Sequence, residues 1–349
     1  MFLLGCIVGV FFLSSLIKKD FFINNTEEIN AIKIIDKQEL KEVIEKKERL
    51  LNEFYKTLPL ENSVEPLEIP TYVERDNQAI HPSVYYDEDR KFGYKWVMAF
   101  TPYSLSKDFT ENPSIVVSED GVNWKEPKGL KNPLAITDKP DKIHYSDTEI
   151  ISNGNELELW YRQSDKPAKL SRILRQKSKD AVNWSKPEII FDYGTGGFGY
   201  GAPSVICKDN VYEIYYREKM KLAEESYVKI KYSENKIKEE AIPVNFEYTE
   251  EYKEFVGWHI EFRKIGDKYY ALTMAYPKST PWQGGKLFLF DSDDGVNFKN
   301  MKLVLKPTKD GFDNKTIYKS SLVVTEDFIN LYYSSISKDN KPYISLIKG

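Results

Sequence analysis

A seven-residue motif recurs along the chain, and this repeat constrains the fold more than any other feature of the sequence. Each copy starts with a serine, has an acidic or Asp-Gly turn in the middle, and ends with an asparagine and an aromatic residue. The clear copies are Ser118–Trp124, Ser178–Trp184 and Ser292–Phe298, with a degenerate copy at Tyr232–Asn235. An Asp-Gly pair between apolar runs predicts a hairpin turn, because Gly readily adopts the positive φ that a tight turn needs.

A second series runs in phase with these turns and consists of a short apolar strand followed by an aromatic-rich strand. The five first strands begin near His81, Ser146, Ala202, Ile260 and Ser320. The partner strands are expected at residues 94–100, 156–161, 211–216, 268–273 and 328–333. Residues 66–349 then provide roughly 57 residues per copy, enough for a four-stranded blade with its loops. We predict an all-β fold, a five-bladed β-propeller whose last blade is completed by an N-terminal strand near residues 67–73.

The composition agrees with this fold and excludes several functions. Tyr occurs 24 times and Met only 5 times, and aromatic residues favour strands over helices. The formal net charge is −4, from 50 basic and 54 acidic residues that are well mixed, so we expect no nucleic-acid partner. Cys6 and Cys207 are the two cysteines, which excludes a disulfide framework and a CxxC metal site.

The N-terminus predicts attachment to a membrane. Residues 1–17 carry no charged side chain. A run of this length is at the short limit for a spanning helix, and the run lacks the basic n-region of a signal peptide. We therefore expect an uncleaved membrane anchor at residues 1–19. Lys18 and Lys19 on its C-terminal side would keep the rest of the chain in the cytoplasm, whereas the function inferred below favours an extracellular propeller. A true start upstream would resolve this conflict.

Residues 20–65 are expected to form a helical stalk and a linker. Asp36 and Glu39 have the spacing of a capping box, and apolar residues then recur at helical spacing up to Phe54. The amphipathic helix should end before Pro59, either as a stalk or docked on the propeller.

The strand starts and turns together resemble the five-bladed propeller glycosidases of glycoside hydrolase families 43 and 32, over about residues 79–349. That resemblance implies three acids at the axial ends of the first strands of blades one to three. Asp147 matches the second of them. His81 stands where the first would be, and Gly201 where the third would be. Either other acids that line the axial funnel of the propeller catalyse the reaction, or the domain binds sugar without cleaving it.

All three histidines of the chain, His81, His144 and His259, lie within three residues of a first-strand start. Because the first strands of a propeller converge on its axis, the sequence predicts a cluster of imidazoles there. Neutral imidazole transfers protons and binds metal ions. Each histidine alone could equally be a structural hydrogen-bonding group.

Glycoside hydrolysis needs two acid or base groups beside the scissile bond. Asp147 and Glu261 are the candidate carboxylates, and His81 and His259 could assist them. The alternatives are an orienting hydrogen bond for Asp147 and a buried salt bridge for Glu261 with Arg162 or Arg217.

The candidate substrate-binding residues flank the same strand ends. Arg162 and Arg217 occupy matching positions in two blades and would suit a carboxylated or phosphorylated sugar. Aromatic rings pack against the C–H faces of sugars. The remaining candidates are Tyr103, His144, Tyr200, Trp258, Trp282 and Tyr318.

These residues predict a hydrolase that cleaves a glycosidic bond in a bacterial surface or environmental glycan. The alternative is a catalytically inactive glycan-binding propeller. The expected partners are carbohydrate and, through the N-terminal helix, a membrane. No cofactor is required by this chemistry, and an axial metal ion stays open.

Overall fold

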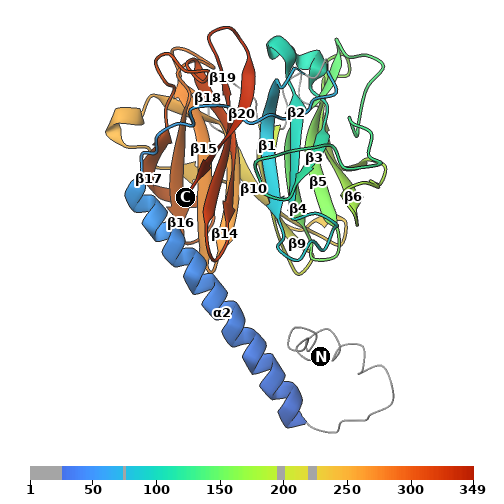
Figure 1. Ribbon diagram of the computed structural model, residues 1–349, viewed down its shortest axis with the longest axis vertical. Coiled ribbons are helices and arrows are strands. Elements are labelled where there is room, and N and C mark those ends of the chain that lie inside the picture. Colours follow the sequence, from blue (N-terminus) through green and yellow to red (C-terminus); the bar gives the residue numbers. More distant parts are fainter. Residues whose placement is uncertain (1–25, 74–75, 195–200, 219–225) are drawn as a thin grey trace, which may run out of the picture. The chain divides into compact units, whose positions relative to one another are not determined.

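The computed structural model describes residues 26–73, 76–194, 201–218 and 226–349. This part of the chain contains five β-sheets, one after another in sequence (Figure 1). Blade one consists of β1 (Ala79–Tyr86), β2 (Trp96–Pro102) and β3 (Ser114–Ser118). Blade two consists of β4 (Ile143–Ser152), β5 (Leu157–Asp165), β6 (Leu170–Ser178) and β7 (Glu188–Gly194). Blade three consists of β8 (Gly201–Lys208), β9 (Val211–Arg217), β10 (Tyr227–Ser233), β11 (Lys236–Ile237) and β12 (Ile242–Pro243).

Blades four and five complete the set. Blade four consists of β13 (Asn245–Phe246), β14 (Phe255–Ile265), β15 (Lys268–Pro277), β16 (Lys286–Ser292) and β17 (Asn297–Leu305). Blade five consists of β18 (Thr316–Val324), β19 (Ile329–Ile336) and β20 (Pro342–Lys348). Short 3-10 helices are η1 (Ser104–Ser106), η2 (Asp108–Thr110) and η3 (Glu250–Tyr252). The first strands β1, β4, β8, β14 and β18 contact one another in order, and β18 contacts β1. The predicted five-bladed propeller is therefore confirmed.

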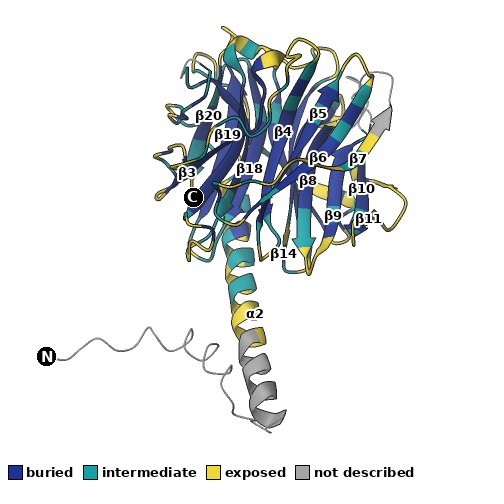
Figure 2. Ribbon diagram, turned by 90° about the vertical axis from the view of Figure 1, so that its right-hand side faces the viewer, coloured by how far each residue is buried: buried dark blue, intermediate teal, exposed yellow. Residues whose placement is uncertain are grey.

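Five apolar clusters, each between two neighbouring blades, form most of the propeller core in the part of the chain that the structure describes. The first and second strands are buried along nearly their whole length, dark blue in Figure 2. Both faces of such a strand are covered by the adjacent blades, which explains why these strands read as apolar and aromatic runs.

The repeated motif forms the predicted tight turn in each clear copy. In the first copy the Ser118 hydroxyl accepts from the Gly121 N–H, and one Asp120 oxygen accepts from the Val122 and Asn123 N–H groups. The third copy repeats these bonds from Ser292 onward. The central residue has a positive φ, which is 72° at Gly121. The turns also join blades, because the Tyr332 hydroxyl of blade five donates to the Gly121 carbonyl at 2.8 Å.

The N-terminal linker lies against blade five, as the sequence suggested. The Leu67 N–H donates to the Ile344 carbonyl of β20 at 2.8 Å, and Leu67 packs in the cluster that Ile344 shares with blade one. Residues 67–73 form no regular strand, so a single backbone bond and apolar packing take the place of the expected fourth strand.

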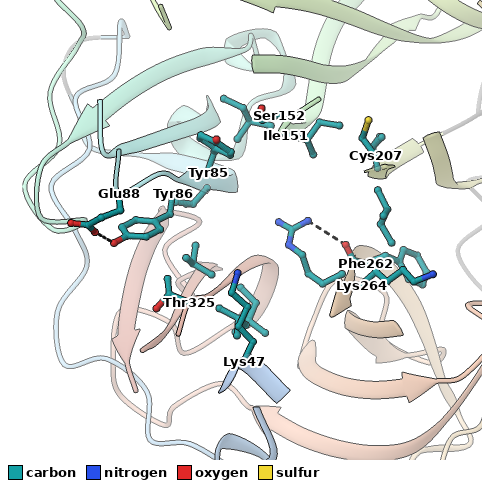
Figure 3. Close-up of a pocket in the computed structure, with 18 of the residues that line it drawn as sticks. Lys47, Tyr85, Tyr86, Glu88, Ile151, Ser152, Cys207, Phe262, Lys264 and Thr325 are labelled. Carbon is teal, nitrogen blue, oxygen red and sulfur yellow. Dashed lines mark hydrogen bonds between the residues drawn. The ribbon is translucent and has the colours of Figure 1, made fainter. Parts of the chain in front are cut away.

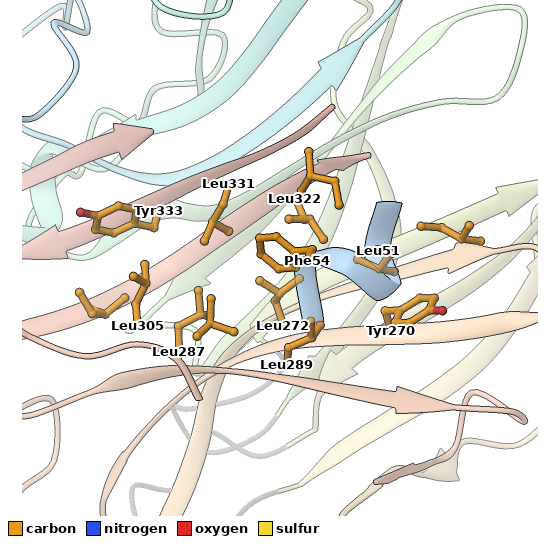
Figure 4. Packing of buried hydrophobic residues seen from close by; sticks show 14 residues of the cluster. Leu51, Phe54, Tyr270, Leu272, Leu287, Leu289, Leu305, Leu322, Leu331 and Tyr333 are labelled. Atoms are coloured by element: carbon orange, nitrogen blue, oxygen red, sulfur yellow. The ribbon is translucent and has the colours of Figure 1, made fainter. Parts of the chain in front are cut away.

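The chain divides into two compact units between Glu45 and Lys46. Helix α2 (Thr26–Thr57) begins ten residues before the predicted capping box and ends before Pro59, as expected. Within the second unit, Leu51 and Phe54 of its last turns insert between blades four and five, against Leu289 and Leu331 (Figure 4). This part of the helix is docked on the propeller.

Among the residues from Thr26 onward that the structure describes, no helix has the length and apolar character needed to cross a membrane. The predicted membrane segment, residues 1–19, lies outside the described residues.

Candidate active site

Each first strand contains a β-bulge near its start, and these bulges build the site. The pairing of first and second strand shifts register between Ile80 and Ser83 in β1 and between Ser146 and Glu149 in β4. It also shifts between Gly257 and His259 in β14, and at equivalent points in β8 and β18. A bulge adds a residue and turns a side chain out of the regular alternation, which is why bulges recur beside active sites.

Three predicted residues from three different blades meet at these bulges: His81, Asp147 and His259. The Asp147 Oδ1 atom lies 3.3 Å from His81 Nε2 and 3.5 Å from His259 Nδ1. One ligand atom from each of the three residues lies within 4.8 Å of the other two. All three side chains are buried, with at most 2% of their surface exposed. His81 and Asp147 also have a positive φ, of 58° and 57°, which is uncommon for residues other than glycine and recurs at functional sites.

The electrostatics favour two neutral imidazoles beside one carboxylate. Burial lowers the pKa of His81 to about 4 and holds the pKa of His259 well below its ordinary value. Burial opposes ionisation of Asp147, but the Arg162 guanidinium and the Ala202 N–H beside it hold its pKa below the ordinary value. Arg162 Nη1 lies 3.4 Å from Asp147 Oδ2, so the predicted Arg162 is part of this site.

The donor set fits a divalent transition-metal ion. Among the residues that the structure describes, none forms a hydrogen bond with His81 Nε2 or with either ring nitrogen of His259, an arrangement that costs free energy unless another ligand satisfies these buried nitrogens. Two imidazoles and one carboxylate with an open side are the ligands of catalytic Zn²⁺ and non-haem Fe²⁺ sites. The second nitrogen of His81, Nδ1, lies 2.9 Å from Thr101 Oγ1, which orients the ring as an outer partner of a metal ligand does.

Glu111 is a site residue that the sequence did not reveal. It follows η2 in the loop after β2, and its carboxylate oxygens lie 3.8 Å from His81 Nδ1 and 3.5 Å from His144 Nε2. Burial raises its pKa well above the ordinary value, and burial lowers the pKa of His144 to about 4. Glu111 therefore lies between the predicted His144 and His81 of the three-residue cluster.

Aromatic rings form one wall of the site. The Tyr318 ring lies 4.2 Å from the His259 ring and 5.6 Å from the His81 ring, measured between centroids. Trp258 contacts the His259 ring edge-on at 6.3 Å. The Arg217 guanidinium lies 4.6 Å from the centre of the Trp258 ring, so the predicted Arg217 contacts this aromatic wall through Trp258.

The other predicted residues have different surroundings. The Tyr103 hydroxyl lies 3.4 Å from Asp108 Oδ1 in the loop that carries Glu111. Tyr200 lies outside the described residues. Glu261 belongs to a buried ion cluster: its Oε1 accepts from Arg263, and its Oε2 accepts from the Leu322 N–H at 2.6 Å.

That ion cluster fills the propeller axis. Lys319 Nζ is fully buried, lies 3.2 Å from Glu149 Oε2, and donates to the Thr148 carbonyl at 2.6 Å. Arg263 bridges Glu149 and Glu261. The carboxylates of Glu149 and Glu261 are thus neutralised by the buried Lys319 and the partly exposed Arg263, and both of the Glu261 oxygens are occupied.

A separate cavity of about 500 Å³ is lined by the C-terminal ends of all five first strands (Figure 3). Its wall includes Tyr85, Ser152, Cys207 and Lys264, together with Lys47 of α2. Because His81, Asp147 and His259 lie near the opposite ends of the same strands, this cavity is at the other end of the axis.

Comparison with known proteins gives one curated relative and many structural neighbours. No family model matches the chain. The chain is 24% identical over 320 residues to an A type blood N-acetyl-alpha-D-galactosamine deacetylase from Flavonifractor plautii, covering 76% of this chain and 41% of that protein. This chain therefore spans less than half the length of the relative.

The solved structures establish the fold. The crystal structure of an N-acetylgalactosamine deacetylase from F. plautii in complex with blood group B trisaccharide has a TM-score of 0.72 at 18% identity, covering 82% of this chain and 94% of that one. A thermostable family-43 glycoside hydrolase has a TM-score of 0.59 at 12% identity, covering 78% and 89%. An exo-1,5-alpha-L-arabinanase from a bovine ruminal metagenomic library has a TM-score of 0.53 at 12% identity, covering 78% and 92%. The fold expected from the resemblance, a family-43-like five-bladed propeller, is confirmed.

Proposed function

We propose that this chain is a metal-dependent hydrolase of glycans that removes the acetyl group from an N-acetylated amino sugar. The observation that carries the proposal is the buried cluster of His81, Asp147 and His259, in which three ring nitrogens form no hydrogen bond with any residue that the structure describes. The F. plautii relative, which is named for deacetylation of N-acetyl-alpha-D-galactosamine, supports the same reaction class. Fold likeness alone would leave many activities open.

The reaction is hydrolysis of an amide. Water adds to the acetyl carbonyl carbon, the C–N bond breaks, and acetate and the free amine of the sugar leave. A divalent ion bound by His81, Asp147 and His259 would supply Lewis-acid activation of the water and the carbonyl.

The chain's own residues provide positioning and proton transfer. Thr101 fixes the orientation of His81, and Arg162 keeps Asp147 ionised. Glu111 is the buried carboxyl group beside His81 and His144, and its position makes it the candidate to take a proton from water and return it to the leaving nitrogen. Tyr318 and Trp258 line the side on which a sugar ring would lie.

Cleavage of a glycosidic bond through Asp147 and Glu261 is the second candidate, favoured by the family-43 glycosidases among the structural neighbours. It requires two carboxyl groups that face one bond. Both oxygens of Glu261 are bonded to Arg263 and Leu322, so this candidate would need Glu261 to leave those partners. We therefore rank it below deacetylation.

The test is to incubate the full-length protein with an oligosaccharide that ends in N-acetylgalactosamine and to assay acetate and free monosaccharide separately. We expect acetate release that a chelator abolishes and that added Zn²⁺ or Mn²⁺ restores. His259→Ala should lower the rate by more than the 10- to 100-fold typical of losing an outer partner of a metal ligand.

The control is Lys128→Met, which changes an exposed residue and should leave the rate unchanged. Release of monosaccharide without acetate would replace this proposal with the glycosidase. Saturable binding without either product would make the chain a glycan-binding propeller.

We also propose that residues 1–19 attach the chain to a membrane with the propeller outside the cell. The support is the uncharged N-terminal sequence and the extracellular location of most complex glycans. Protease treatment of intact cells should degrade the propeller, and full protection would place it inside.

A further inference from the structure

Trp282 is an exposed aromatic residue in the loop between β15 and β16, with 43% of its surface accessible. Its φ is +61°, a left-handed conformation that is uncommon for a bulky residue. Strain of this kind persists only where the surroundings fix it, and it collects at ligand-binding sites.

The backbone on both sides of Trp282 is fixed by hydrogen bonds. The Thr280 N–H donates to Pro277 at 3.0 Å, and the Gly284 N–H donates to the Lys315 carbonyl at 2.9 Å. A Cβ atom at Gly285 would lie 2.9 Å from the Ile317 carbonyl, so the loop is pressed against the start of β18. The exposed ring is therefore presented in a defined position.

One ring connects Trp282 with the active site. The Trp258 ring contacts the Trp282 ring edge-on, with centroids 5.8 Å apart at 83°. Trp258 also contacts His259 at 6.3 Å, and Tyr318 packs against the apolar cluster that contains Trp258. Trp282 thus lies only two ring contacts from a residue of the metal cluster.

A single exposed aromatic residue on a protein surface is ordinary and by itself indicates nothing. Trp282 differs in two respects: its backbone is strained and held, and its ring continues the aromatic wall formed by His259 and Trp258. Flat aromatic rings offer a large apolar face at low entropic cost, and the C–H face of a pyranose ring is complementary to such a surface.

We propose that Trp282 is a stacking platform for the pyranose next to the sugar held at the His81–Asp147–His259 cluster, so that the protein binds an oligosaccharide better than a monosaccharide. The inference rests on the proposed function for the identity of the first sugar. It concerns a second sugar and a residue that does not touch the reacting amide.

The test compares binding of a trisaccharide that ends in N-acetylgalactosamine with binding of free N-acetylgalactosamine, by calorimetry on the full-length protein. The wild type should bind the trisaccharide more tightly. Trp282→Ala should weaken trisaccharide binding about 2- to 12-fold, the range that one ring contact of 0.5–1.5 kcal/mol gives. Binding of the monosaccharide should not change, and Trp282→Phe should recover most of the loss.

Ile189→Ala is the control, because Ile189 is 52% exposed on the outer strand β7 of blade two. It should bind both sugars as the wild type does. Equal trisaccharide binding by wild type and Trp282→Ala, or no preference of the wild type for the trisaccharide, would overturn the inference.

Failure of the proposed function gives a different result. If the wild type releases no acetate but its trisaccharide binding still depends on Trp282, the platform stands and the deacetylase does not. If acetate is released and KM for the trisaccharide is the same in Trp282→Ala, the deacetylase stands and the platform does not.

Discussion

Lys319→Met tests how much the buried ion cluster on the propeller axis contributes to stability. The Lys319 ammonium is fully buried, lies 3.2 Å from Glu149, and donates to the Thr148 carbonyl. Methionine has a similar volume but no charge. Among the described residues, the substitution therefore leaves Arg263 as the one cation paired with Glu149, and it leaves the buried Thr148 carbonyl without this donor.

Removing one partner of a buried ion pair costs about 3–5 kcal/mol, because the other charge stays buried without full compensation. We expect Lys319→Met to lower the free energy of unfolding by this amount, which is a large part of the 5–15 kcal/mol of a typical domain. Glu149→Gln keeps the shape and removes the opposing charge. The double variant should therefore be more stable than the sum of the two single effects predicts, by roughly 0.5–3 kcal/mol.

The assay is urea unfolding of the purified full-length chain, followed by tryptophan fluorescence, with Lys128→Met as the exposed control. A fall in the midpoint at constant m-value reports a change in stability alone. If Lys319→Met costs less than about 1 kcal/mol, the assignment of the cluster as a structural element of the axis is wrong.

Three further predictions concern the rest of the fold. Phe54→Ala, in the helix segment between blades four and five, should cost about 3–5 kcal/mol in the same unfolding assay, and a loss below 1 kcal/mol would mean that the helix is not docked. Gly295 has a φ of +69°, and a Cβ atom there would lie 2.7 Å from a tyrosine hydroxyl, so Gly295→Ala should lower the free energy of unfolding by about 1–3 kcal/mol. Gly154→Ala is the comparison, because φ is +89° there but no atom of the described residues lies within 4 Å of the added Cβ. Gly295→Ala should destabilise clearly more than Gly154→Ala. The backbone N–H of Asn297 holds the pKa of Asp294 below its ordinary value, so the stabilisation from Asp294 is present at neutral pH and is lost as the pH falls below about 4. Between pH 5 and pH 2, Asp294→Asn should therefore lose less stability than the wild type does. The same loss in the variant and in the wild type would contradict the role of this turn.

The repeat made the architecture predictable from sequence. The turn motif needs a particular set of hydrogen bonds from Ser118 and Asp120, and its spacing sets the size of a blade. Strand ends were less predictable: β15, for example, runs to Pro277 rather than to residue 273, because the apolar residues and the pairing with β14 both continue beyond residue 273.

Part of the site was predictable because histidine is rare in this chain and first strands converge on the axis. His81, Asp147 and His259 were found in that way. Sequence could not separate Glu261 from the cluster that contains His259, since these two residues are two apart on β14 and residues two apart on a strand share a face. The bulges decide which carboxylate lies between the histidines and which stays in the axial ion cluster, and bulges leave no clear pattern in one sequence.

Glu111 could not be predicted on the same basis. It lies in a loop, after η2 and outside any regular period, and only the fold brings it beside His81 and His144. Lys319 was equally hidden, because a lysine within a strand sequence usually indicates an exposed edge rather than a fully buried cation.

The central claim is that His81, Asp147 and His259 hold one divalent metal ion. The most direct measurement is a calorimetric titration of the metal-stripped full-length protein with Zn²⁺, repeated with Asp147→Asn, His259→Ala and Trp282→Ala. We predict one tight site per chain in the wild type and in Trp282→Ala, and its loss in the other two variants. Equal Zn²⁺ binding by the wild type and His259→Ala, or no tight site in the wild type, would contradict the account.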